Sequence, residues 1–278
     1  LDKLLGGFQR SDLVILGARP SMGKTSLLLN IAHNAAKALV EGKPHGAAVG
    51  VLSLEMSSRQ LVQRMAAGAA GIDGQRIASG QLTDDISRLA AVTGELADLP
   101  IHVDDKAGMS VQEMRARARQ MKRQYGIGLL VVDYLQLATS PSKRSELSKV
   151  QEVSDISMGL KQIARDLDIP VLVASQLSRS VESRENKRPT LSDLRESGSI
   201  EQDADVVAFL YRPEYYLRQQ LGAGSESTAA SDSERRKLME LQDQIEKLKG
   251  VTELIIAKHR NGPTDTVRLL FQPQTTTF

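Results

Sequence analysis

Short apolar segments of the kind that form buried β-strands alternate along this sequence with longer segments of helical periodicity. Such alternation is typical of a mostly parallel, twisted sheet with helices on both faces, because parallel strands need helical crossovers. The first six runs are almost continuously apolar, which is typical of strands buried on both faces. The eight runs cover residues 13–17, 48–54, 101–105, 128–137, 170–177, 205–212, 253–260 and 266–272. The helical segments between the early runs cover 24–41, 57–70, 83–98, 110–124 and 147–168.

The last two runs flank NGPTD (261–265), a turn sequence that favours an antiparallel hairpin at the edge of the sheet. The 278 residues suffice for one large α/β domain, and no internal repeat indicates a second one. We therefore predict an α/β fold over residues 1–278 with an antiparallel C-terminal edge hairpin. Because the first residue is Leu1 rather than Met, we expect the chain to be a fragment or a trimmed domain.

The composition argues against several kinds of site. The chain has no cysteine, which excludes disulfides, zinc–thiolate centres and cysteine nucleophiles and fits a reducing compartment. No apolar run approaches the roughly 18 residues that span a bilayer, so we expect no membrane segment, and no signal peptide opens the chain. The net charge of +2 is too balanced to indicate a polyanionic partner by itself. Aromatic residues make up only 3%, so a nucleic-acid site would hold phosphates rather than stack bases.

The sequence GARPSMGKTS (17–26) lies between the first apolar run and the first helical segment. A phosphate-binding loop, G-x-x-x-x-G-K-[ST], occurs in this context, but the motif expects a glycine where the chain has Ala18. Alanine also fits there if φ is negative, whereas Gly23 has to let the backbone approach a phosphate. The alternative interpretation is a helix start that contains GKT by chance.

In a phosphate-binding loop, backbone N–H groups at the helix start surround the β-phosphate, because unpaired donors and the helix dipole favour an anion there. The Lys24 ammonium neutralises charge on the β- and γ-phosphates, and the Thr25 hydroxyl ligates Mg²⁺. We therefore predict ATP and Mg²⁺ as cofactors. The predicted ATP-binding residues are Ala18, Arg19, Pro20, Ser21, Met22, Gly23, Lys24, Thr25, Ser26 and, in contact with the base, Arg212.

Three polar residues follow apolar runs where parallel strands would end, at the edge that the phosphate loop shares. Asp133 ends the run LLVVD, the pattern of a carboxylate that holds Mg²⁺ through water. Glu55 follows the second run and could polarise the water that attacks the γ-phosphate. It could equally be an acid at a helix start that Ser53 caps. Gln176 could sense the γ-phosphate or be an ordinary polar residue at a strand end.

Lys258 and Arg260, in AKHRNGP, stand two positions apart and so share one face of a strand. They could be a solvated pair at the sheet edge, which is the common fate of such charges. They could instead reach the nucleotide of a neighbouring subunit, as an arginine finger does. The chemistry of the two side chains leaves both interpretations open.

Two stretches interrupt the alternation of strands and helices. Residues 178–199 are polar and rich in turn formers, which predicts one long loop or two loops around a short helix. Residues 217–250 begin with a flexible composition and end in a charged segment with apolar residues at 238, 241, 245 and 248. That spacing predicts an amphipathic helix. We expect 217–250 to be a surface insertion between two strands.

Taken together, these motifs resemble the RecA-like motor domain of the DnaB family of bacterial hexameric replicative helicases. The Ala-Arg-Pro that displaces the first glycine of the loop is part of the resemblance, which covers nearly the whole chain except 217–250. The matching segments, in the family's order, are LDKLLGGFQRSDLVILGARPSMGKTS, VGVLSLEMS, LLVVDYLQL, SQLSR, LRESGSIEQDADVVAFLYR and IIAKHRNGPTDTVRLLF.

The resemblance implies a RecA-like P-loop NTPase fold and a role for each motif. Glu55 would activate water and Gln176 would sense the γ-phosphate, while Lys258 and Arg260 would act in trans on the adjacent subunit's ATP. The loop 178–199 would line the channel of a ring and contact single-strand phosphates, largely through backbone groups. The implied catalytic residues are Lys24, Glu55, Gln176, Lys258 and Arg260, the metal-binding residues Thr25 and Asp133, and the DNA-binding residues Arg195, Glu196 and Gly198.

The implied function is ATP-driven movement, 5′ to 3′, along single-stranded DNA by a homohexameric ring that unwinds the replication fork in the bacterial cytoplasm. Primase and a helicase loader would be partners of the full-length protein. We expect the family's N-terminal domain and linker helix to be absent from this chain, which leaves ring formation and primase binding open. His259 stands where the family often has glutamine. The alternatives are a RecA-fold recombinase or a clock or signalling ATPase, and a non-enzymatic assembly platform, which would not need both Glu55 and Asp133.

Overall fold

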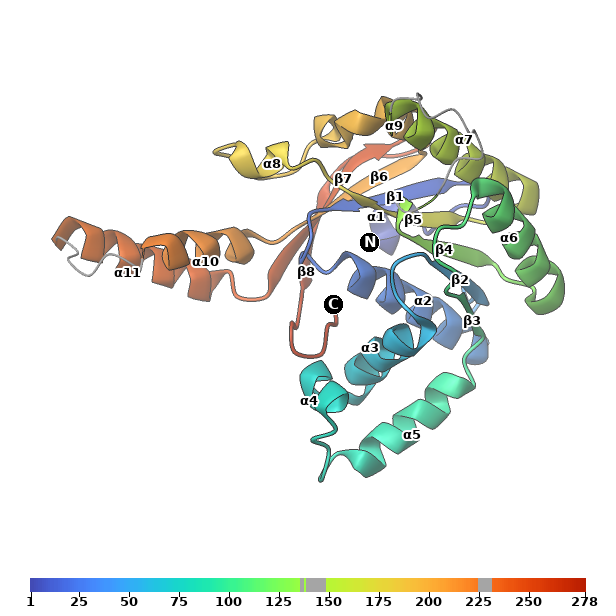
Figure 1. Ribbon diagram of the computed structural model, residues 1–278, viewed down its shortest axis with the longest axis horizontal. Coiled ribbons are helices and arrows are strands. Elements are labelled where there is room, and N and C mark those ends of the chain that lie inside the picture. The colour runs from blue at the N-terminus through green and yellow to red at the C-terminus, as the bar shows by residue number, and fades with distance from the viewer. Residues whose placement is uncertain (136–137, 139–148, 225–231) are drawn as a thin grey trace.

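The computed structural model describes residues 1–135, 138, 149–224 and 232–278, and a single eight-stranded sheet forms its centre (Figure 1). The strands are β1 (Leu13–Ala18), β2 (Val49–Ser53), β3 (Ile101–Asp104), β4 (Leu129–Asp133), β5 (Val171–Gln176), β6 (Val206–Tyr211), β7 (Val251–His259) and β8 (Thr266–Leu270). Their order in the sheet is β3-β2-β4-β5-β1-β6-β7-β8. The first six strands run parallel, and β7 and β8 add an antiparallel hairpin at one edge. The predicted fold class is confirmed.

Helices cover both faces of the sheet, with α7 and α9 above it, α6 to its right, and α2 and α3 below it in Figure 1. The helices are α1 (Asp2–Leu5), α2 (Lys24–Val40), α3 (Ser58–Ala70), α4 (Gly74–Ser79), α5 (Ile86–Ala97), α6 (Val111–Tyr125), α7 (Lys149–Leu167), α8 (Ser180–Ser183), the 3₁₀ helix η2 (Leu191–Ser197), α9 (Gly198–Asp203), α10 (Pro213–Gly224) and α11 (Asp232–Lys247). Among the described residues, none of these helices has the length and apolar character to cross a bilayer.

Two hydrophobic cores lie on opposite faces of the sheet. Successive residues of a strand point to opposite faces, and β1 feeds both cores. Leu13 and Ile15 pack with α6 and α7, while Val14 and Leu16 pack with α2 and α3. Every residue of β1 is buried, which explains why its sequence is continuously apolar rather than alternating.

Strand β3 is less buried than its sequence predicts. The expectation of burial on both faces holds for β1, β2 and β4 and for all but the last residue of β5 and of β6, but all four residues of β3 are half-buried. The reason is its place at the edge of the sheet, where β2 is its single strand neighbour. A hydrophobic run therefore indicates that a strand exists, but not whether neighbours cover it.

The segment between β5 and β6 contains more helix than the predicted loops around one short helix. It has α8 and then η2, which leads directly into α9. Asp193 explains part of the difference, because its carboxylate accepts a hydrogen bond from the backbone N–H of Thr190 at 2.8 Å. Aspartate and serine, which are typical of turns, here bond to backbone groups around short helical segments.

The predicted surface insertion is a helical hairpin. Helix α10 runs to Gly224, so residues 217–224 are helical and not flexible as expected. Its start has Pro213, a favoured first helical residue, and the nearby Tyr216 is buried. The segment expected to be an amphipathic helix forms α11, in which Ile245 is buried and Leu238 and Leu241 are half-buried. Leu248, also half-buried, follows the helix. Figure 1 shows α10 and α11 together, extending away from the sheet.

Gly17 has a packing role that its sequence position does not reveal. It pairs with Phe209 across β1 and β6. A Cβ atom at Gly17 would lie 2.8 Å from the Phe209 ring and 3.0 Å from the Leu177 side chain. Both side chains are buried and have little room to move. The early glycine of the GARPSMGKTS segment is therefore explained by close packing within the sheet core.

We predict that Gly17→Ala destabilises the fold by roughly 1–3 kcal/mol, the usual cost of overpacking a dense core. Urea unfolding monitored by circular dichroism measures the change. The control is Gly94→Ala, since Gly94 lies exposed in α5 with no atom within 4 Å of a new Cβ, apart from its own helix's backbone. That control should stabilise the protein by up to about 1 kcal/mol through helix propensity. Equal stability of the two variants would contradict the packing role.

Candidate functional site

The loop between β1 and α2 has the backbone of an anion-binding turn. Ser21 and Gly23 have positive φ values of 66° and 94°. Among the described residues, no side chain caps the start of α2 at Gly23, so its first N–H groups remain available to an anion. Ala18 lies within β1 itself, in extended conformation, which explains why this position needs no glycine.

Thr25 and Asp133, the two predicted Mg²⁺ ligands, are brought together. The Thr25 hydroxyl donates a 2.7 Å hydrogen bond to Oδ2 of Asp133, whose residue is only 3% exposed. The other carboxylate oxygen, Oδ1, is buried and has no hydrogen-bond partner among the described residues. An unpaired buried carboxylate oxygen is costly, and a hard cation takes oxygen ligands of this kind. The hydroxyl and the carboxylate therefore fit a Mg²⁺ site.

Lys24 lies in a partly desolvated position close to negative charge. Its Nζ is 4.3 Å from the centre of the Tyr134 ring. Burial lowers the pKa of Lys24, and the negative charges of Asp133 and Glu55 oppose that shift. Burial, followed by the same two carboxylates, raises the pKa of Tyr134. An anionic ligand at the loop would add to the charges that stabilise the Lys24 ammonium in this setting.

Glu55 stands in the turn between β2 and α3 with its side chain exposed. The alternative in which it begins a helix capped by Ser53 is wrong. The cap of α3 is Ser57, which forms a reciprocal capping box with Gln60. Ser53 Oγ instead donates to the Met56 carbonyl at 2.6 Å. Glu55 is thus free of a capping role and lies within electrostatic reach of Lys24.

The register of the parallel strands aligns the predicted residues along one edge. Asp133 at the end of β4 pairs with Ser53 at the end of β2. Gln176 at the end of β5 pairs with Ala18 at the end of β1. The carboxyl edge of the sheet therefore carries Asp133 and Gln176 beside the phosphate loop, as predicted for strands of one direction. Their chemical roles stay predictions.

Arg19 binds within the protein, on the side of the loop next to α8. Its guanidinium donates to the Leu177 carbonyl at 2.8 Å and forms an ion pair with Glu182 at 2.8 Å. The residue is almost completely buried. Arg19 thus connects the phosphate loop to the end of β5 and to α8, a link that the sequence does not reveal. Met22 is likewise buried, in the core beneath the loop.

An aromatic cluster that the sequence analysis missed lies against the same loop. Arg212 donates to the Ser21 carbonyl at 3.2 Å, and its guanidinium carbon lies 4.6 Å from the Phe271 ring centre. The Phe278 ring is 4.6 Å from Phe271, and both rings would contact a Cβ atom at Gly23. The sequence offered one signal for this cluster, which is the small number of phenylalanines. The chain has four, and three of them pack against Gly17 or Gly23.

Lys258 and Arg260 lie at the opposite end of the strands from the phosphate loop, where the parallel strands begin. Because β7 is antiparallel to β6, Lys258 pairs with Val207 and His259 with Val206, at the beginning of β6. The length of β1, roughly 17 Å at the usual rise per residue, separates this end of the strands from the phosphate loop. Burial, with the nearby Arg260 charge, lowers the pKa of Lys258. The two cations therefore face away from the nucleotide loop of their own chain.

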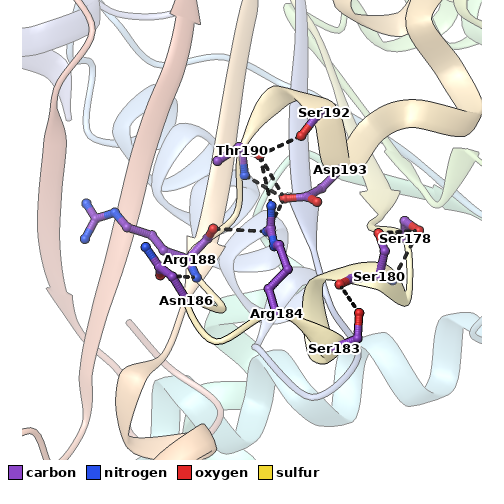
Figure 2. Close-up of polar contacts among 9 residues, drawn as sticks. All are labelled: Ser178, Ser180, Ser183, Arg184, Asn186, Arg188, Thr190, Ser192 and Asp193. Carbon is purple, nitrogen blue, oxygen red and sulfur yellow. Dashed lines mark hydrogen bonds and ion pairs between the residues drawn. The ribbon is translucent and has the colours of Figure 1, made fainter.

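The predicted DNA-binding segment is organised around a buried carboxylate, as Figure 2 shows. Asp193 accepts hydrogen bonds from Arg184 at 2.7 Å and from the Thr190 backbone at 2.8 Å. Arg188 forms an ion pair with Glu253 of β7, which neutralises its positive charge. The structure describes the backbone of residues 195–198, in η2 and α9. The side chains of the predicted contacts Arg195 and Glu196, and the exposure of Gly198, lie outside the described part of the chain.

Comparison with known proteins bears on the family of this chain. The family model for the DnaB-like helicase C terminal domain matches residues 1–278. Replicative DNA helicase DnaB of Rickettsia bellii is 47% identical over 283 residues, which cover 100% of this chain and 55% of the relative. Replicative DNA helicase DnaB of Geobacillus stearothermophilus is 46% identical over 272 residues, covering 98% of this chain and 53% of the relative. The chain thus spans about half the length of these relatives.

Solved structures agree with the sequence comparison. One of them, described as an ATPase domain, superposes with a TM-score of 0.82 at 37% identity, covering 100% of this chain and 87% of that chain. A DnaB-like replicative helicase, described with its interactions with primase, has the same TM-score and identity and is covered to 59%. The fold, the phosphate loop and both comparisons lead to one conclusion: the chain belongs to the DnaB-like helicase C-terminal domain family and has its RecA-like fold.

Proposed function

We propose that this chain is the ATP-hydrolysing motor of a replicative DNA helicase, which moves 5′ to 3′ on single-stranded DNA as a homohexameric ring. One observation carries the proposal: the Thr25–Asp133 site lies where the parallel strands end, and the Lys258–Arg260 pair lies where they begin. Such a chain completes a catalytic site only when the Thr25–Asp133 site of one copy meets the Lys258–Arg260 pair of the next copy. A head-to-tail ring satisfies that requirement for every copy.

Within one chain, the loop residues bind and orient the nucleotide. The backbone N–H groups after Gly23 and the Lys24 ammonium would hold the phosphates. Thr25 and Asp133 would hold Mg²⁺, which supplies charge neutralisation at the phosphate oxygens when bound. Glu55, exposed and near Lys24, would orient and deprotonate the attacking water. Gln176 would contact the γ-phosphate from the adjacent strand end.

Lys258 and Arg260 would stabilise the negative charge that develops on the neighbouring subunit's ATP. The segment that contains Arg195, Glu196 and Gly198 would contact single-stranded DNA through its backbone. Primase and a helicase loader are proposed partners of the longer protein, and the bacterial cytoplasm is its proposed location. The recombinase and the clock or signalling alternatives are not favoured, because the family match and the relatives are replicative helicases.

We predict that Lys24→Ala lowers ATP hydrolysis by roughly 100-fold or more, the usual cost of losing a charge that stabilises the transition state. The measurement is phosphate release at saturating ATP, with and without single-stranded DNA. Lys43→Ala is the control, since Lys43 is exposed after α2 and pairs only with Glu41 among the described residues. An unchanged rate of ATP hydrolysis in Lys24→Ala would contradict the assignment of this loop to nucleotide binding.

Glu55→Gln should reduce hydrolysis by roughly 10²–10⁴-fold while ATP binding persists, because glutamine keeps the shape but cannot accept the proton. Binding of a fluorescent ATP analogue and single-turnover hydrolysis separate the two effects. Glu95→Gln, at an exposed position of α5, is the matched control. If hydrolysis by Glu55→Gln matched that of the control, the general base would have to be another residue.

Arg260→Ala should reduce kcat by roughly 10³-fold or more, as the loss of an arginine finger does. The affinity for ATP should remain, because Arg260 lies at the edge away from its own loop. Hydrolysis and nucleotide binding are measured in the assembled ring. Arg123→Ala, at an exposed position of α6, is the control. Normal turnover by assembled Arg260→Ala would rule out its role in trans.

A further inference from the structure

Asp205, which no sequence motif singled out, is a buried carboxylate where three elements meet. Its Oδ2 accepts a 2.8 Å hydrogen bond from the backbone N–H of Leu13, the first residue of β1, and also binds Lys161 of α7. Its Oδ1 lies 3.1 Å from Nη1 of Arg260. The Asp205 side chain is only 4% exposed, whereas that of Arg260 is 50% exposed. The carboxylate is thus fixed from inside the protein and presents one oxygen to Arg260.

The backbone around Asp205 adds to this attachment. Its N–H donates to the Leu13 carbonyl at 2.9 Å, and its carbonyl accepts from the Arg260 N–H at 2.8 Å. Nη2 of Arg260 also lies 3.4 Å from the Gln202 carbonyl. A guanidinium has five N–H donors, so these two side-chain contacts leave three for a ligand. The exposed half of Arg260 can therefore bind a phosphate while its other side stays on Asp205.

The local charges also fit a role toward phosphate. Asp205 carries one negative charge and contacts two cations, Lys161 and Arg260. Lys161 occupies the inner oxygen and leaves the outer one to Arg260, while Asp12 is a second carboxylate within electrostatic reach of both cations. The half-exposed guanidinium of Arg260 is therefore the charge that this group presents to solvent. Beside it, Lys258 donates to the carbonyls of Glu201 at 2.5 Å and Ala204 at 2.7 Å, at the C-terminal end of α9. Helix ends of this kind favour cations.

We infer that Asp205 is a positioning residue that holds the Arg260 guanidinium in the orientation in which it acts on the ATP of the adjacent subunit. The inference rests on the proposed function, because it assumes that Arg260 acts in trans. It goes further by assigning the orientation of that side chain to one buried carboxylate. It also connects Arg260, through the Gln202 carbonyl, to α9, which begins at Gly198 in the predicted DNA-binding segment.

Asp205→Asn should lower kcat roughly 100-fold, a typical effect of a misplaced catalytic group, while the variant still binds ATP at its own loop. The decisive readout is complementation in mixed rings. A Lys24→Ala subunit cannot hydrolyse ATP but has an intact Arg260. It should therefore restore hydrolysis at the intact loop of an Asp205→Asn neighbour, which a defect confined to the variant's own folding or site would not allow.

In a one-to-one mixture, about a quarter of the head-to-tail interfaces combine an intact loop with an intact finger. We expect hydrolysis well above the sum of the two pure variants. Arg260→Ala mixed with Lys24→Ala is the reference mixture. Asp85→Asn is the matched control, since Asp85 is also a mostly buried carboxylate between two cations, Arg76 and Arg88. That control should hydrolyse ATP at the normal rate without a partner variant.

Three outcomes are distinguishable. Restored hydrolysis in both mixtures supports the inference. Restored hydrolysis with Arg260→Ala but not with Asp205→Asn overturns the inference and leaves the proposed function intact. Failure of the Arg260→Ala mixture overturns the role of Arg260 in trans and the inference with it. Thermal unfolding and binding of a fluorescent ATP analogue verify folding first; if Asp205→Asn does not fold, Asp205→Glu, which keeps the charge next to Lys161, replaces it.

Discussion

The pairing of β1 with β5 and β6 along its whole length is the interaction on which the rest of the structure depends. At its carboxyl end, it delivers Ala18 and the phosphate loop beside Gln176. At its amino end, the backbone of Leu13 binds Asp205, which in turn contacts Arg260. One buried strand thus fixes both halves of the proposed shared site. The phosphate loop lies at the carboxyl ends of the parallel strands and Arg260 at their amino ends, so the two halves of the site cannot meet within one chain.

Close packing around this strand explains the unusual loop sequence. Gly17 leaves room for Phe209 and Leu177, and Gly23 leaves room for Phe271 and Phe278. Three of the four phenylalanines therefore pack against these two glycines. Large rings packed against these glycines leave the loop little space, an arrangement that would suit the proposed phosphate site, where preorganised donors act best.

Most buried charged groups have partners, although Asp133 and Asp203 each have one buried carboxylate oxygen without a hydrogen-bond partner among the described residues. Arg19, Asp193 and Asp205 are buried, and each has charged and backbone partners. Such pairing is expected, because an unpaired buried charge is expensive. Asp133 has one satisfied oxygen and one, Oδ1, that lacks a partner among the described residues. Asp133 lies beside Thr25 at the predicted Mg²⁺ site, where a cation would pair with Oδ1.

The sequence by itself determined the parallel sheet, its C-terminal hairpin and the loop from Gly17 to Ser26, because apolar periodicity and glycine positions are local signals. It also predicted that Asp133 and Gln176 share an edge, since strand direction alone decides that. The Ser57–Gln60 capping box and the helical residues 217–224 are local features that the sequence patterns used here missed, whereas only the tertiary structure decided that β3 is an edge strand. It alone placed Lys258 and Arg260 opposite the loop and joined Asp205 to Arg260. These features depend on contacts between residues far apart in the chain, which local patterns do not encode.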